Sequence, residues 1–293
     1  MAESQPRKVH TKAMAFKKLA KRVGAGIVLI PIVLLITYRG GPAFACFVAL
    51  LAALGSSEFV KMAAARGFRV SGLAVIPGSA LVVLAFYFGG LAMAGAAITL
   101  VALVTMIERL LRADVETYVL SISLSLTAVI YTGWLLGSFI LLREFPAAAL
   151  EPELAGAGDI GRWLVFMVLV LSWSNDSGAY FVGSAVGRHK LMVRVSPSKT
   201  VEGALGGIAA CIGAALVCRA TFASFFGPGE AVLAGILVGA ACIVGDLVES
   251  MLKRSTGVKD SSNLIPGHGG LLDRFDSLLF AGPVFYLFAR LVL

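Results

Sequence analysis

The sequence predicts an all-α membrane protein, a polytopic bundle of transmembrane helices, from its composition and from the lengths of its apolar segments. Of its 293 residues, 58% are hydrophobic and 14% are charged, and the mean hydropathy is +0.91. Soluble domains are usually about 45–50% apolar and about 25% charged. A water-soluble fold of this length could not bury so much apolar surface, whereas a bilayer replaces water around the helices.

About nine apolar segments are long enough to cross roughly 30 Å of hydrocarbon at 1.5 Å per residue, some only with their flanking residues. They are approximately 22–38, 42–60, 71–88, 91–107, 118–142, 162–184, 203–224, 230–250 and 277–293. Only Gly89-Gly90 separates the third segment from the fourth. We therefore expect a basic cytoplasmic N-terminus (1–22), a first group of transmembrane helices (23–142), an extracytoplasmic loop (143–161) and a catalytic transmembrane region (162–293).

The basic residues predict the orientation of the chain in the membrane. With a cytoplasmic N-terminus and nine alternating spans, only five of the 25 Lys and Arg residues fall outside, namely Arg39, Arg143, Arg162, Arg219 and Arg290. The other 20 lie in cytoplasmic segments, as the positive-inside rule requires. The net charge of +8 thus indicates a membrane orientation and not a nucleic-acid partner. We expect a multi-pass protein of a bacterial inner membrane.

Several polar or reactive residues are expected to have structural roles only. Glu58 and Glu108 are interpreted as interfacial ends of their helices, and the loop 143–161 as a solvated connector. All four cysteines lie inside apolar stretches without a CxxC pair, so we interpret them as buried thiols.

A first polar segment, residues 172–180, interrupts an apolar span. It contains Asn175, Asp176 and Tyr180. Asp176 and Tyr180 are four residues apart and share one helix face. A carboxylate beside lipid is costly, so Asp176 is expected to face a polar cavity and to be functional. The alternative is a polar patch for helix packing.

A second segment, residues 183–207, is rich in groups that bind phosphate. Hydroxyls, a lysine and backbone N–H groups at a helix start suit an anion. The candidate residues are Arg188, Ser196, Ser198, Lys199, Thr200 and Glu202. The same residues also fit a plain helix N-terminus. Gly203 and Gly207 are expected to form a helix-packing face.

A third segment, residues 245–276, contains the densest charge. Asp246, Glu249, Ser250 and Lys253 fall on one stripe of a helix. Further candidates follow at Arg254, Lys259, Asp260, His268, Asp273, Arg274 and Asp276. Carboxylates beside lysines and arginines favour hard cations such as Mg²⁺ together with phosphates. Zinc is not favoured, because the other two histidines lack acidic neighbours. A salt-bridge belt at the membrane surface is the alternative, but it would not need glycines around a histidine.

At this third segment the sequence resembles the phosphatidate cytidylyltransferases, also called CDP-diacylglycerol synthases. The matching residues are Ser250, Leu252, Lys253-Arg254, Lys259-Asp260, Ser262, Ile265-Pro266, His268-Gly269-Gly270, Leu271 and Asp273-Arg274-Phe275-Asp276. The resemblance continues upstream in Asn175-Asp176, Ala179-Tyr180, Gly183, Gly187-Arg188, Ser196-Pro197, Lys199-Thr200 and Glu202-Gly203. It is specific over about residues 170–280, whereas the N-terminal half agrees only in being hydrophobic.

The resemblance implies a reaction of CTP with phosphatidic acid that gives CDP-diacylglycerol and pyrophosphate. It implies Mg²⁺, a second cation such as K⁺, and a homodimer. The implied catalytic residues are Asp246, Lys253, Lys259, Asp260, His268 and Asp273, with Asp246, Asp273 and Asp276 binding metal. The implied substrate-binding residues are Asn175, Asp176, Tyr180, Arg188, Ser196, Ser198, Lys199, Thr200, Glu202, Glu249, Arg254 and Arg274.

Three other functions are compatible with a membrane protein that carries such segments. A CTP-dependent lipid kinase would transfer the γ-phosphate of CTP instead. A CDP-alcohol phosphotransferase would need an Asp-Gly dipeptide, which the chain lacks. An ion-coupled transporter would more often place its charges at mid-span, whereas here they gather at one membrane face.

Overall fold

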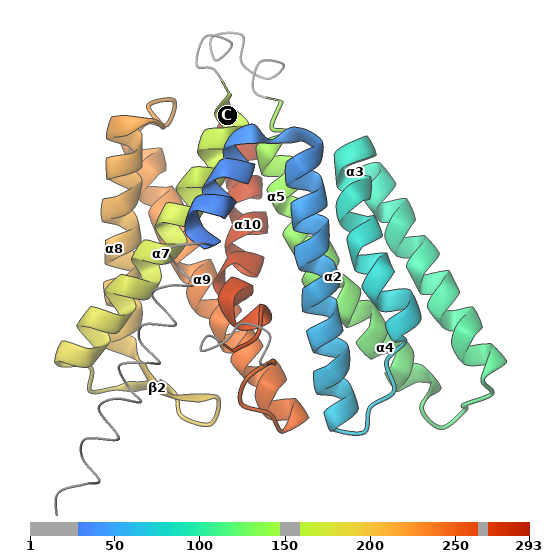
Figure 1. Cartoon of the computed structure of the whole chain (residues 1–293). Helices are drawn as coiled ribbons and strands as arrows, with labels where there is room; N and C mark the ends of the chain where they lie inside the picture. The colour runs from blue at the N-terminus through green and yellow to red at the C-terminus, as the bar shows by residue number, and fades with distance from the viewer. Residues whose placement is uncertain (1–28, 147–158, 263–268) are drawn as a thin grey trace, which may run out of the picture.

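The computed structural model describes residues 29–146, 159–262 and 269–293, and these residues form a bundle of helices (Figure 1). Seven of these helices are long and apolar enough to cross a membrane. They are α2 (Gly41–Ala65), α3 (Gly72–Leu111), the continuous helix Tyr118–Arg143, α7 (Ile160–Val186), α8 (Val201–Thr221), α9 (Pro228–Thr256) and α10 (Leu272–Val292). A shorter apolar helix, Leu29–Arg39, precedes them. The predicted helical membrane bundle is thus confirmed, while the count of nine spans is not.

The difference in the count lies partly in α3, which contains two of the expected spans. Gly89 and Gly90 have non-helical dihedral angles, and Gly90 has a φ of +60°, a conformation that favours glycine. A Cβ atom at Gly78 would lie 2.7 Å from the Val101 side chain. A straight helix would hold these two residues about 35 Å apart. The two halves of α3 therefore pack side by side, as Figure 1 shows.

The helix Tyr118–Arg143 is interrupted by one wider turn. It consists of α4 (Tyr118–Val129), a π-helical turn (Ile130–Trp134) and α5 (Leu135–Arg143). In the π-helical turn, the Thr132 hydroxyl donates to the Ser79 hydroxyl at 3.1 Å. This bond joins the turn to α3.

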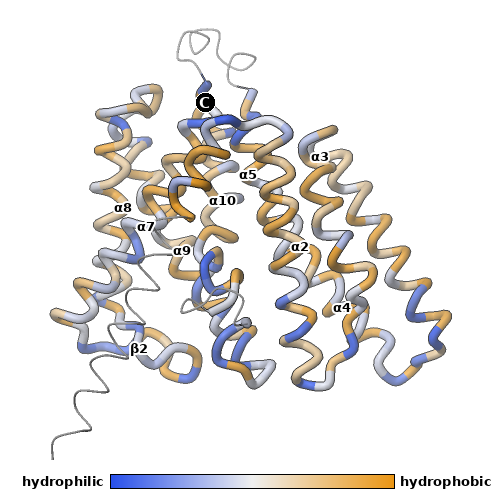
Figure 2. Tube along the Cα trace, viewed as in Figure 1, coloured by the Kyte–Doolittle hydropathy of each residue, from blue (hydrophilic) through white to orange (hydrophobic). Residues whose placement is uncertain are grey.

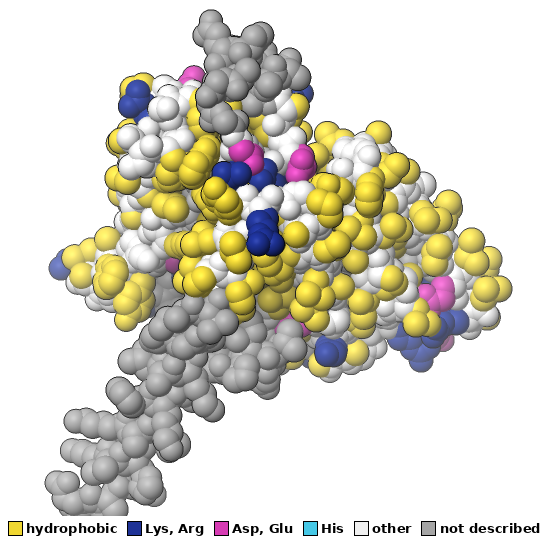
Figure 3. Space-filling model, turned by 45° about the horizontal axis from the view of Figure 1, so that its top comes forward, with side chains coloured by type: hydrophobic (Ala, Val, Ile, Leu, Met, Phe, Trp, Pro, Cys, Tyr) yellow, Lys and Arg dark blue, Asp and Glu magenta, His cyan; other side chains and the backbone are white. Residues whose placement is uncertain are grey.

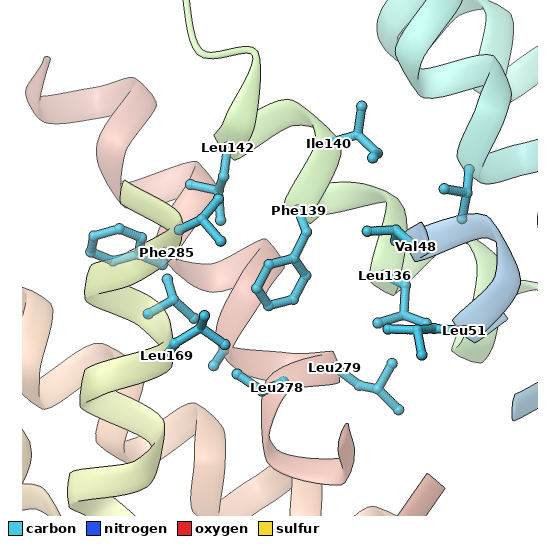
Figure 4. Close-up of a cluster of buried hydrophobic side chains, with 14 of the residues drawn as sticks. Val48, Leu51, Leu136, Phe139, Ile140, Leu142, Leu169, Leu278, Leu279 and Phe285 are labelled. Atoms are coloured by element: carbon cyan, nitrogen blue, oxygen red, sulfur yellow. The ribbon is translucent and has the colours of Figure 1, made fainter. Parts of the chain in front are cut away.

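The helices form two groups that meet at α10. Helices α7 to α10 pack together at one side and α2 to α5 at the other, and α10 contacts α5, α7 and α9. Figure 4 shows Leu136 and Phe139 of α5 facing Leu278 and Leu279 of α10. Because lipid is as apolar as these side chains, the contact depends on close packing more than on exclusion of water.

Small residues bring α7 and α8 close together, as predicted for Gly203 and Gly207. A Cβ atom at Gly207 would lie 2.6 Å from the Asn175 side chain, and one at Gly203 would lie 2.9 Å from the Ala179 carbonyl oxygen. No larger side chain fits at either position without a shift. This packing fixes the position of the polar end of α7 relative to α8.

The all-α prediction missed a short β-hairpin between α7 and α8. Strand β1 (Lys190–Met192) pairs antiparallel with β2 (Ser196–Thr200). The polar segment before Gly203 was expected to start a helix, and α8 does begin at Val201 with the Thr200 side chain accepting a bond from the Gly203 N–H. The residues before Thr200 extend instead, since pairing with β1 satisfies their backbone groups.

The surface of the bundle suits a bilayer. Hydrophobic residues fill the middle of the helices in Figure 2, and hydrophilic ones gather at the lower turns. Apolar side chains also cover much of the face in Figure 3. One correction concerns the ends of the segment 143–161, which are not simply solvated: Arg143 is buried and pairs with Asp159 at 2.7 Å.

The close contact between α8 and α9 can be tested with a matched pair of glycine substitutions. In Gly235→Ala, the new Cβ atom would lie 2.6 Å from the Ile212 Cα atom, which the backbone of α8 holds in place. We expect a loss of about 1–3 kcal/mol in the free energy of unfolding. In Gly213→Ala, the new methyl group meets nothing within 4 Å. The thermal midpoint of this control should stay the same or rise. Equal midpoints for the two variants would contradict the packing.

Candidate active site

A polar cavity of about 510 Å³ lies between α7, β2, α8, α9 and α10. Its polar lining side chains are Asn175, Asp176, Tyr180, Ser184, Ser198, Lys199, Thr200, Asp246, Asp273, Asp276 and Ser277. These residues come from all three polar segments that the sequence singled out. The fold thus brings segments that are up to 100 residues apart in the chain to one cavity.

The carboxylates reach the cavity from three different helices. Asp176 and Tyr180 line it from one face of α7, as their spacing predicted. Asp246 comes from α9, and Asp276 from the first turns of α10. A Cβ atom at Gly245 would lie 2.5 Å from the Asp276 carbonyl oxygen. Glycine at this position therefore lets α9 and α10 approach closely beside the two aspartates.

Lys199 supplies a positive charge among these carboxylates. Its Nζ atom forms an ion pair with Asp246, which joins β2 to α9. Both side chains remain partly exposed to the cavity. The charges of Asp246, Lys199 and Arg274 also act on Asp176. An anion that entered the cavity could compete with Asp246 for the lysine.

A second lysine, which is half-buried, lies behind the cavity. Lys253 Nζ lies 2.5 Å from Glu249 and 2.6 Å from Asp273, and the Glu249 side chain is only 1% exposed. Neither Lys253 nor Glu249 lines the cavity. The stripe predicted on α9 therefore divides in two. Asp246 lines the cavity, whereas Glu249 and Lys253 form an ion-pair network that holds Asp273 in place.

Asp273 is bonded on both of its oxygen atoms. Oδ1 accepts from Lys253, and Oδ2 accepts from the backbone N–H groups of Ser261 at 3.1 Å and Gly270 at 2.8 Å. The Ser261 hydroxyl also lies 3.0 Å from Oδ2. Asp273 therefore joins the end of the α9–α10 connection to the cavity wall.

The remaining predicted residues lie away from the cavity or outside the described residues. Glu202 accepts from the backbone N–H groups of Arg188 and His189 and so fixes the start of the hairpin. Arg254 donates to the Val195 carbonyl oxygen at 3.4 Å. Ser196, Lys259 and Asp260 do not line the cavity, and the last two are exposed. His268 falls among residues 263–268, which the structure does not describe.

Comparison with known proteins identifies the family. The sequence profile described as "Cytidylyltransferase family" matches residues 20–292. The chain belongs to this family. The resemblance predicted from residues 170–280 is thereby confirmed, and it extends over the N-terminal half as well.

Three relatives show how far the similarity of this cytidylyltransferase-family chain reaches. The phosphatidate cytidylyltransferase of Pseudomonas aeruginosa is 37% identical over 274 residues, which covers 91% of this chain and 95% of the relative. That of Bacillus subtilis is 40% identical over 164 residues, or 56% of each chain. The uncharacterized protein YnbB of Escherichia coli is 40% identical over 163 residues, or 56% of this chain and 53% of the relative. The chain thus spans about half the length of the last two.

The donor set of the cavity can hold a hard cation. Asp176, Asp246 and Asp276 offer carboxylate oxygens in one cavity. Within the described residues, no group of three or more His, Cys, Asp or Glu side chains is placed to hold a metal ion, so protein groups alone do not make a metal site. Mg²⁺ usually takes one or two carboxylates and completes its shell with water and substrate phosphates. The cavity therefore fits Mg²⁺ bound together with a phosphate substrate.

Glu58 of α2 was not predicted as part of the site, but it binds the residues on both sides of the segment 263–268. Its Oε1 atom accepts from Ser262 Oγ at 2.5 Å and from the Leu271 N–H at 2.8 Å. Its Oε2 atom accepts from Ser261 Oγ at 3.0 Å and from the Leu272 N–H at 2.9 Å. Glu58 is only 1% exposed, so the interfacial interpretation was wrong. A carboxylate in an apolar helix was the available signal.

Gly270 packs closely against Glu58 and the Ser261 hydroxyl group that binds it. A Cβ atom at Gly270 would lie 1.8 Å from the Ser261 hydroxyl and 2.7 Å from Glu58 Oε2. The preceding Gly269 has a φ of +86°. Both positions therefore favour glycine. Gly269 has a left-handed backbone conformation, and Gly270 has no room for a side chain.

Replacing Glu58 should weaken its hydrogen bonds to the residues on both sides of the segment 263–268. In Glu58→Gln one carboxylate oxygen becomes an amide NH₂ group, which cannot accept from these residues. We expect the free energy of unfolding to fall by about 2 kcal/mol or more, because buried donors lose a charged acceptor. The measurement is the thermal midpoint in detergent, with exposed Glu144→Gln as the charge-matched control. An unchanged midpoint in Glu58→Gln would argue against these hydrogen bonds.

Proposed function

We propose that this protein transfers the cytidylyl group of CTP to phosphatidic acid, giving CDP-diacylglycerol and pyrophosphate. The observation that carries the proposal is the cavity where Asp176, Asp246 and Asp276 meet Lys199. Its family and its similarity over 91% of the chain to the enzyme named phosphatidate cytidylyltransferase in Pseudomonas aeruginosa support the same reaction. Phospholipid biosynthesis is the role that follows.

The proposal includes a membrane topology. We infer that both halves of α3 cross the bilayer and that the apolar helix Leu29–Arg39 belongs to a first span, which gives nine spans and a cytoplasmic N-terminus. The separation of basic residues supports this orientation. The cavity would then open on the cytoplasmic side, where CTP is present, in a bacterial inner membrane. A homodimer is part of the same proposal, by resemblance to the family.

The chemistry needs little proton transfer. A phosphate oxygen of phosphatidic acid is already an anion near neutral pH, and it attacks the α-phosphorus of CTP. One P–O bond forms, and the bond from the α-phosphorus to the bridging oxygen breaks as pyrophosphate leaves. The task of the protein is to bring two anions together and to stabilise the charge on the leaving group. This explains a cavity with aspartates and a lysine in place of a histidine or cysteine nucleophile.

The residues of the cavity have distinct proposed roles. Lys199 would leave Asp246 in part to bind a phosphate of CTP, while Ser198 and Thr200 offer hydroxyl groups beside it. Lys253 and Glu249 would keep Asp273 in place without touching the substrate. Arg188, Arg254, Lys259, Asp260 and His268 stay candidates for outer contacts with CTP or the lipid headgroup.

Mg²⁺ would be held by Asp246 and Asp276, with Asp273 as a further ligand, and K⁺ is a second cation implied by the family resemblance. When bound, Mg²⁺ neutralises charge on the phosphate oxygens. Without a cation, the negative charges of Asp176, Asp246 and Asp276 would repel the phosphates of the nucleotide. The three carboxylates are close enough to repel one another as well. A cation therefore fits both the donor set and the charge balance.

The fate of isotopic label tests the reaction. Purified protein in detergent receives phosphatidic acid, Mg²⁺ and CTP labelled at the α-phosphate or at the γ-phosphate. We expect α-label in the lipid fraction and pyrophosphate in the aqueous phase. Transfer of γ-label alone would identify a lipid kinase. No transfer from either nucleotide by folded protein would favour a transporter.

Substitution of the cavity aspartates tests their roles. Asp246→Asn and Asp273→Asn should each lower turnover by about 100-fold or more, because each removes a charge that orients a phosphate or cation. Asp246→Asn should keep its thermal midpoint, whereas Asp273→Asn should also lose stability as Lys253 loses a partner. Glu144→Gln is the control and should keep both properties. Near-normal turnover of Asp246→Asn with Mg²⁺ present would remove Asp246 from the site.

A further inference from the structure

A second cavity lies apart from the candidate active site, at the lower turns of the N-terminal helix group. It measures about 310 Å³ and lies between the end of α2, the connection 66–71 and the end of α3. Three arginines line it, namely Arg69, Arg109 and Arg112, with Asp114. It shares no lining residue with the active-site cavity. The connection 66–71 lies at the same end of the bundle as the β-hairpin (Figure 1).

The charges around this second cavity do not balance. Arg69 pairs with Asp114 at 2.8 Å, and Arg112 pairs with Glu108 at 2.7 Å. Arg109 is only 4% exposed, and its Nε atom is buried without a hydrogen-bond partner. Among the residues that the structure describes, none forms an ion pair with Arg109. One buried positive charge is therefore left over.

A buried charge without a partner is unfavourable. An ionised group taken out of water costs several kcal/mol unless a counter-charge or hydrogen bonds replace its hydration. Arginine cannot avoid this cost by losing its proton, because the guanidinium group stays protonated in proteins. Extending to the membrane surface is the usual solution for arginine at a helix end, but a side chain that is 4% exposed has not done so. An anion in the cavity would supply the counter-charge that none of the described residues provides.

We propose that this arginine cavity binds the phosphate group of an anionic ligand, either a phospholipid headgroup or free phosphate. Arginine presents a planar fork of N–H donors that matches phosphate oxygens. The volume lies at the lower end of the range for small-ligand pockets. Leu110 and Leu111, which are 68% and 80% exposed beside Arg109, would lie against acyl chains. The site would bind this phosphate group away from the candidate active site.

Thermal stabilisation of delipidated protein in detergent tests this site. The probes are dioctanoyl phosphatidylglycerol, dioctanoyl phosphatidylcholine and inorganic phosphate. Phosphatidylglycerol is a phosphodiester and not the substrate proposed for the enzyme, so the result is independent of the proposed function. We expect phosphatidylglycerol, but not zwitterionic phosphatidylcholine, to raise the thermal midpoint of the wild type.

Variants of the arginines test whether phosphatidylglycerol binds in this cavity. Arg109→Gln should raise the half-saturating concentration of phosphatidylglycerol about tenfold or more, because it removes a charge-assisted bond. Without lipid, its midpoint should equal or exceed that of the wild type, since an unpaired charge is gone. Arg66→Gln removes an exposed charge outside the cavity and should bind like the wild type. If Arg109→Gln does not fold, Arg69→Gln tests the same cavity from an exposed side chain.

The outcomes separate the two sources of phosphate. Stabilisation by phosphatidylglycerol that depends on Arg109 assigns a lipid headgroup. Stabilisation by inorganic phosphate alone, also dependent on Arg109, assigns a soluble phosphate. Equal responses of the wild type and Arg109→Gln to both probes would overturn the proposal. So would the absence of any response in the wild type.

Discussion

The geometry of the candidate active site depends on carboxylates that accept hydrogen bonds from the connection between α9 and α10. Glu58 reaches this connection from α2, more than 200 residues earlier in the chain, and binds it at four points. Asp273 binds it from the other side and is itself held by Lys253. Backbone N–H groups buried away from water need acceptors, and an ionised carboxylate is a strong one. The N-terminal helices thus contribute to a site whose cavity the C-terminal helices line.

Close packing of helices supplies the second constraint. Glycines at the contacts between α7, α8, α9 and α10 let the backbones approach until carbonyl oxygens and Cα atoms touch. The parts of α7, α9 and α10 that carry Asp176, Asp246 and Asp276 thereby surround one cavity. Three carboxylates at such a point repel one another, and only Lys199 among the described cavity residues pairs with one of them by a direct ion pair. This arrangement favours binding of a cation and is consistent with a phosphate substrate that arrives with one.

The two cavities lie at the same end of the bundle and carry excess charges of opposite sign. The active-site cavity has an excess of carboxylates, whereas the cavity beside Arg109 has an excess of positive charge. The excess is partly buried in each case, since Asp246 and Lys199 are only partly exposed and Arg109 is 4% exposed. A cation would complete the first and a phosphate the second. Because the two cavities share no lining residue, ligands of both kinds would bind without competition.

The sequence by itself determined the membrane bundle, the family and most of the residues around the cavity, because hydropathy and the order of residues in a motif are properties of the chain alone. Asp176 and Tyr180 were found from a four-residue spacing, and Asp246 and Lys253 from a helical stripe. Only the tertiary structure decided that Asp246 faces the cavity while Lys253 lies behind it, since both lie on the same stripe. It also decided the roles of Glu58 and Arg109. A charged residue in an apolar helix was a signal for each, but its burial and its partners depend on distant segments that pack against it.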